Sequence, residues 1–167
     1  FNDKQNLNIK LGKQTLDWGK SYNFLNGLNS VNSFNYISLT RPGIEAKERV
    51  IPTEMLSFTV GLSDRLKVEG FYQLKFRPAV VDGCGTFFAI SDVLPANCGP
   101  MLVAGLKDKL SETALRAESY IPRTADRKPK DSGQYGIAIK QNIEQLNNAE
   151  LGIYYANFHN RIANFDA

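Results

Sequence analysis

The chain has 167 residues, of which 43% are hydrophobic, and its net charge of +3 comes from 20 basic and 17 acidic side chains. These charges are scattered along the chain instead of forming the basic stripe typical of nucleic-acid binders, so no nucleic-acid partner is expected. No apolar run approaches the roughly 18 residues that a membrane-spanning helix needs, which excludes a helical membrane protein.

The first expected element is a strand over residues 6–16. Leu7, Ile9 and Leu11 alternate there with polar or small residues such as Lys10. Because successive side chains of a strand point to opposite faces, this strand has one apolar and one polar face.

A long connection over residues 17–53 follows. Four of its side chains could gather where it joins the sheet: Asp17, Trp18, Arg41 and Glu45. Such a cluster would either constrict a pore or consist of exposed ion pairs, which contribute little to stability. The connection also carries several aromatic residues, so it either folds over the mouth of a barrel as a lid or plug, or packs only on itself.

The clearest pattern is a hairpin with strands over residues 54–62 and 66–77, joined by a tight turn at Ser63, Asp64 and Arg65. In its second strand the even positions are mostly apolar, and most odd positions are polar: Lys67, Glu69, Gln73 and Lys75. This period of two predicts strands with two different faces.

A second long connection covers residues 78–132 and contains both cysteines, Cys84 and Cys98, in a segment rich in Gly, Pro, Asp and Asn. An even number of cysteines in such a segment favours a disulfide and an oxidising compartment, although two free cysteines in a loop are the alternative. Residues 101–118 have the apolar spacing of a short helix.

A second hairpin is expected over residues 133–143 and 149–159, again with a short turn. Its apolar positions alternate with polar or small ones that include Lys140 and Glu150. Both short turns thus lie at one end of the sheet and both long connections at the other, which is the loop asymmetry of outer-membrane barrels. Trp18, Phe76 and Phe158 lie near strand ends, where such barrels carry interfacial aromatic residues.

The predicted fold class is therefore all-β: an antiparallel up-and-down meander that forms part of a transmembrane β-barrel with long extracellular loops. Five strands are fewer than the eight of the smallest bacterial barrels, so they are expected to be a fragment of a larger barrel. A secreted, soluble β-sandwich that binds a ligand through its aromatic loops would give the same alternation and is the alternative.

In the barrel interpretation, the polar strand positions face a watery lumen and form a mixed, slightly cationic wall that would influence what passes. The candidate lumen residues are Lys10, Lys67, Glu69, Gln73, Lys75, Lys140 and Glu150. Phe71 and Tyr154 share this face; they would suit a passage for amphipathic molecules or would pack against a plug.

Enzymatic chemistry is not expected, and neither is a cofactor or a metal. The serines lack a GxSxG nucleophile motif, and there is no phosphate-binding GxxxxGK[ST] run. The single histidine, His159, lies between asparagines near a strand end, where a solvated or interfacial role is expected.

Five phrases, in this order, resemble a family of large proteobacterial outer-membrane proteins known as domain-of-unknown-function family 1302. They are LGKQTLDWG at 11–19, TRPGIEAKE at 40–48, LSFTVGLSDRLKVEGFYQLKFRP at 56–78, CGTFFAISDVLPANC at 84–98 and DSGQYGIAIK at 131–140. Members of that family are several times longer, which implies that this chain is an internal piece. The resemblance implies an outer-membrane β-barrel associated with uptake or export of hydrophobic compounds, and it carries over no catalytic residues.

The functional expectation is thus a porin-like segment in the bacterial outer membrane, used by hydrophobic or amphipathic small molecules. The implied partners are outer-membrane lipid, a lipid-like cargo and a periplasmic carrier protein.

Overall fold

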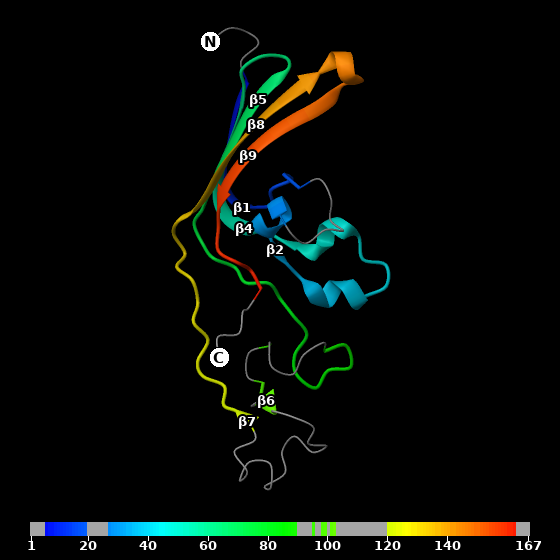
Figure 1. Cartoon of the computed structure of the whole chain (residues 1–167), viewed down its shortest axis with the longest axis vertical. Coiled ribbons are helices and arrows are strands. Elements are labelled where there is room, and N and C mark those ends of the chain that lie inside the picture. Colours follow the sequence, from blue (N-terminus) through cyan, green and yellow to red (C-terminus); the bar gives the residue numbers. More distant parts are fainter. Residues whose placement is uncertain are drawn as a thin grey trace.

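The computed structural model describes residues 6–19, 27–89, 95, 98–99, 101–102 and 120–162. Five long strands form one antiparallel sheet in the order β1-β4-β5-β8-β9 (Figure 1). They are β1 (Asn6–Gln14), β4 (Thr53–Gly61), β5 (Leu66–Gln73), β8 (Gln134–Ile143) and β9 (Ala149–Asn157). The expected all-β antiparallel meander is confirmed. The sheet is open, with β1 and β9 at its edges, and the described residues do not close it into a barrel.

Shorter elements lie in the connections. Two small sheets pair β2 (Ser33–Phe34) with β3 (Val50–Ile51), and β6 (Met101–Leu102) with β7 (Tyr120–Ile121). The 3-10 helices are η1 (Gly27–Val31), η2 (Tyr36–Thr40), η3 (Ala46–Arg49) and η4 (Glu144–Leu146). Within the described ranges, no helix has the length and apolar content needed to cross a membrane. The helix expected over 101–118 falls mostly outside the described residues, and its first two residues form β6.

The two short turns lie side by side at one end of the sheet. Arg65, in the β4–β5 turn, forms a 2.7 Å ion pair with Glu144, in the β8–β9 turn. The backbone N–H of Asn142 also donates to the Arg65 carbonyl oxygen at 2.8 Å. Asn147 and Asn148 adopt positive φ angles in the second turn, a conformation that asparagine tolerates better than most residues. Both long connections therefore leave the opposite end of the sheet, as the loop lengths predict.

The strands end slightly earlier than the alternation predicts at that opposite end. β1 ends at Gln14 instead of residue 16, and β5 ends at Gln73 instead of residue 77. Beyond β5, the backbone N–H of Phe76 donates to the Asp131 carboxylate at 2.9 Å rather than to a neighbouring strand. The chain thus leaves the sheet before residue 77.

The buried core lies on one face of the sheet only. Its members come from the first long connection and from three strands: Trp18, Val31, Met55, Phe71 and Ala138. In Figure 1 the described part of the first connection, from η1 to β3, lies beside the end of the sheet from which the long connections leave. We call residues 15–52 the covering segment; the structure describes 15–19 and 27–52 of it.

Candidate functional site

One face of the five-stranded sheet is apolar and exposed. The strand register aligns its side chains in rows, and one row crosses all five strands through Leu7, Val60, Val68, Ile139 and Ile153. The neighbouring rows add Ile9, Leu11, Leu56, Phe58, Tyr72, Tyr135, Ile137 and Tyr155. We call these thirteen side chains the apolar face. Exposed fractions of 74% for Leu11 and 67% for Ile153 show that no described part of the chain packs on them.

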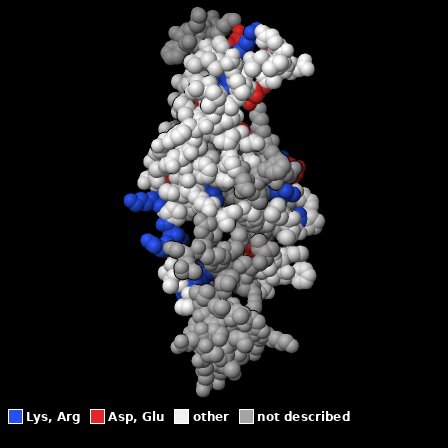
Figure 2. Space-filling model, viewed as in Figure 1, with Lys and Arg blue, Asp and Glu red and all other residues white. Residues whose placement is uncertain are grey.

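Charged groups are sparse over the strands in the view of Figure 2. Three tyrosines, Tyr72, Tyr135 and Tyr155, instead lie on the apolar face toward the end with the long connections, and the rings of Tyr135 and Tyr155 are 6.4 Å apart. The expectation that Trp18 would be an interfacial aromatic is wrong. Its indole is buried on the opposite face, because apolar and aromatic partners are available there.

The opposite face is covered by the chain itself, and we call it the covered face. Its centre is the Trp18 cluster, which consists of Trp18, Glu69, Phe71, Lys140 and Tyr154. The indole Nε1–H donates to Glu69 Oε2 at 2.9 Å, and Lys140 Nζ donates to the same oxygen at 2.8 Å. Trp18 is only 3% exposed, and its ring lies 5.0 Å from Phe71 in an edge-on arrangement and 5.6 Å from Tyr154.

Small residues on the covered face make room for the indole. A Cβ atom added at Gly136 would lie 2.6 Å from the Phe71 ring and 3.1 Å from Trp18. Ala138, two residues along β8, is fully buried in the same cluster, and Ala156 of β9 packs against it. On β8, small side chains of the covered face alternate with large side chains of the apolar face, so the covered face has room for the indole.

A second set of contacts holds the covering segment near the end of the sheet. Gln73 Nε2 and the Arg161 guanidinium each donate to the Val31 carbonyl oxygen at 3.0 Å. Arg161 also donates to Gln73 Oε1. Burial lowers the pKa of Arg161 to about 10, so the side chain stays cationic at neutral pH. Asn32 adds a reciprocal pair of bonds to the backbone of Leu16, at 2.9 and 2.7 Å.

The candidate lumen residues occupy positions of the covered face or continue its alternation. Glu69, Gln73 and Lys140 are engaged in the contacts just described, whereas three others are exposed: Lys10, Lys67 and Glu150. Lys75 lies beyond the end of β5, in the second connection.

The four side chains expected to cluster in the first connection are not brought together by any contact between described residues. Trp18 belongs to the covered face, while Asp17, Arg41 and Glu45 are exposed. Glu45 instead pairs with Lys47 at 2.7 Å and caps η3 together with Glu48. The local helix turn supplies the partners of Glu45, so its charge is used within η3.

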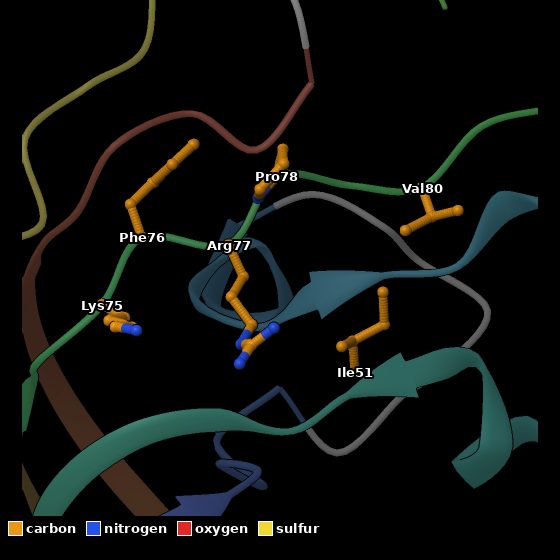
Figure 3. Close-up of a pocket in the computed structure, with 6 residues that line it drawn as sticks. All are labelled: Ile51, Lys75, Phe76, Arg77, Pro78 and Val80. Carbon is orange, nitrogen blue, oxygen red and sulfur yellow. The ribbon is translucent and has the colours of Figure 1, made fainter. Parts of the chain in front are cut away.

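A shallow pocket of about 260 Å³ lies where the second connection begins. Its lining consists of Ile51, Lys75, Phe76, Arg77, Pro78 and Val80, and in Figure 3 the Arg77 side chain points toward Ile51 and away from Phe76. Arg77 already donates two hydrogen bonds to Glu54, whose hydrogen bond and charge raise the pKa of Arg77. This pairing neutralises one of the two cations of the lining, so the pocket would bind an anion only weakly.

The chemistry of the remaining groups is limited. Cys84 and Cys98 form the expected disulfide, which closes part of the second connection. In the described ranges, no group of three His, Cys, Asp or Glu side chains could hold a metal ion. His159 lies with its ring 6.1 Å from that of Phe76.

Sequence reasoning missed the role of Arg161 and of the small residues in β8 and β9. Arg161 is a single cation that follows the last strand, so no periodic pattern in the sequence indicates its role. On the covered face, however, Gly136, Ala138 and Ala156 are small, whereas the residues that alternate with them on the apolar face are large. That pattern indicates room for a bulky side chain on the covered face.

The five strands thus form an open antiparallel sheet. One of its faces is apolar and exposed, and the other is covered by the chain itself. The chain matches the model of a protein family of unknown function (DUF1302) over residues 1–167, and it belongs to that family. No curated protein and no solved structure matches it.

Proposed function

We propose that this chain is part of the wall of a bacterial outer-membrane β-barrel through which hydrophobic or amphipathic small molecules pass. The observation that carries this proposal is the contrast between the two faces of one sheet. Eleven of the thirteen apolar side chains in register are exposed and the other two, Val60 and Val68, are half-buried, and a soluble protein rarely leaves so large a contiguous apolar patch in water. Lipid is the occupant that fits an apolar sheet face with tyrosines toward one end.

The dimensions of the strands support the same proposal. The long strands have 9, 9, 8, 10 and 9 residues, close to the 9 to 11 or so that a tilted strand needs to cross a bilayer. Short turns at one end and long connections at the other are the asymmetry of such barrels. Closure in lipid would pair the β1 and β9 edges with further strands, because unpaired backbone groups are too costly in a bilayer.

A soluble sandwich would need a second sheet to cover the apolar face. The other sheets among the described residues have two strands of two residues each, which is too little to bury five long strands. The polar and aromatic composition of the covered face suits the passage of amphipathic molecules without chemical conversion.

Two neighbouring substitutions test the proposal in the full-length protein. Ile9 lies on the apolar face and Asn8 on the other, and both are exposed at the same depth of β1. Ile9→Lys should lower the free energy of unfolding by about 2 to 4 kcal/mol if the face contacts lipid near mid-bilayer. Asn8→Lys should change it by less than about 0.5 kcal/mol, as for ordinary surface positions.

The measurement is the yield of assembled protein in the outer-membrane fraction, followed by unfolding in lipid vesicles. Equal yield and equal stability of the two variants would contradict a lipid-facing apolar face. Recovery of the wild-type protein as a soluble monomer without detergent would favour the sandwich instead.

A further inference from the structure

We propose that Trp18 is the residue that sets the size limit of the passage, and that the Glu69–Lys140 ion pair holds it in place. This inference rests on the proposed function, since it assigns the narrowest point to the face that would line the lumen. The covering segment would then fold inward as a constriction rather than outward as a surface loop.

The contacts show that Trp18 is held on the sheet and does not merely lie near it. Its indole N–H and the Lys140 ammonium share one carboxylate oxygen of Glu69, at 2.9 and 2.8 Å. Lys140 is only 8% exposed and also lies 5.9 Å from the centre of the Tyr154 ring. A half-buried carboxylate with two donors is a specific arrangement, because the loss of either donor leaves charge without full compensation.

The geometry also places Trp18 over the middle of the sheet, well inside the strand ends. Its indole bonds to Glu69, the fourth residue of the eight-residue β5, and lies against Phe71 on the same strand. The strand register puts Ala138 and Tyr154 beside Glu69 on β8 and β9. The side chain thus covers three neighbouring strands at mid-height, where an obstruction narrows a lumen most directly.

The tether of Trp18 is short. Only residues 15–17 separate it from the end of β1, and Asn32 clamps the backbone of Leu16 from both sides. The exposed residues Lys10, Lys67 and Asn8 leave part of the same face open to solvent. A solute that moves along this face therefore contacts the indole. The size of the solute, and whether it can displace the Trp18 ring, decide whether the solute passes.

The experiment compares four full-length proteins in lipid vesicles: wild type, Trp18→Ala, Trp18→Phe and Arg41→Ala. Influx of uncharged sugars of increasing size is recorded as vesicle swelling. Trp18→Ala should raise the influx of the larger sugars several-fold, and Trp18→Phe, which keeps an aromatic ring but loses the N–H donor, should have a smaller effect. Arg41→Ala is the control, since Arg41 is an exposed residue of the same segment.

A second readout reports the position of the indole without relying on transport. A cysteine introduced at the buried position Ala138 should react slowly with a water-soluble maleimide and several-fold faster when Trp18→Ala is added. Glu69→Gln should also speed the reaction, because it removes the charge that holds Lys140 and weakens the acceptor for the indole. Cys84 and Cys98 are joined in a disulfide and do not compete for the reagent.

The outcomes separate the two proposals. Faster labelling together with faster influx of large sugars supports the inference. Unchanged labelling in Trp18→Ala, or faster labelling with unchanged influx through an active wild-type protein, overturns the inference and leaves the proposed function standing. Absence of sugar influx through every variant, wild type included, overturns a water-filled lumen, on which both the inference and the proposed passage of amphipathic molecules depend.

Discussion

The apolar face and the covered face belong to the same five strands, yet they are satisfied in different ways. On the covered face, long-range hydrogen bonds join partners within the chain, such as Trp18 with Glu69 and Arg161 with Gln73. On the apolar face, no described segment packs over Ile153 and Leu11, which remain mostly exposed. This difference shows that specific contacts within the chain stabilise the covered face. The apolar face instead presents its side chains to whatever surrounds the sheet.

The sharpest way to separate the faces is to make the same substitution on each. Gln73 is fully buried on the covered face, whereas Gln141 is exposed on the side of the apolar face, beside Leu66 in the register. Gln73→Leu should lower the free energy of unfolding by about 3 kcal/mol, because it removes partners of the Val31 carbonyl and of the Arg161 cation.

Gln141→Leu should leave stability unchanged in detergent and should raise it in lipid, where an added apolar side chain is favoured. Chemical unfolding of both variants in vesicles and in detergent measures the two effects. A loss of equal size in both variants would mean that the faces do not differ as we describe.

A smaller effect is expected from adding one methyl group at the seat of Trp18. Gly136→Ala would place a Cβ 2.8 Å from the backbone oxygen of Tyr155 and 2.6 Å from Phe71, so it should cost about 2 kcal/mol through overpacking. Gly61→Ala is the matched control, because its Cβ would meet nothing closer than 3.8 Å. Thermal unfolding of the pair gives the comparison, and equal midpoints would show that the covered face is loosely packed.

The smallest effect is expected at the end with the short turns. Arg65 and Glu144 form an ion pair whose side chains are both more than half exposed. Arg65→Ala should therefore cost less than about 1 kcal/mol, and added salt should reduce the difference from wild type. A loss of several kcal/mol that salt does not change would show that the two turns are held together by more than surface charge.

Much of the fold was predictable because alternation is a local signal. Apart from Phe71, the residues Leu66 to Gln73 alternate between apolar or small even positions and polar odd positions, so the strand and its two faces follow from the printed sequence. The pairings of β4 with β5 and of β8 with β9 followed from the two short turns, since a short turn joins neighbouring antiparallel strands. The disulfide followed from the even number of cysteines in a loop-like segment.

The site was harder to predict because its contacts join residues far apart in sequence. Trp18 and Glu69 are separated by 51 positions, and Arg161 and Val31 by 130, and no local pattern links either pair. A tryptophan near a strand end suits both an interfacial girdle and an inward plug, and only the tertiary arrangement decides between them. The small residues of β8 on the covered face were the available sign that this tryptophan would pack there.

The most direct test of the central claim is a measurement of what surrounds each face. Spin labels are introduced singly at Ile153, on the apolar face, and at Lys67, an exposed residue of the other face, in full-length protein in vesicles. We predict that the label at position 153 is relaxed mainly by oxygen, which concentrates in lipid, and the label at 67 mainly by a water-soluble nickel chelate. Strong relaxation of the label at 153 by the nickel chelate would show that water covers the apolar face and would contradict the account.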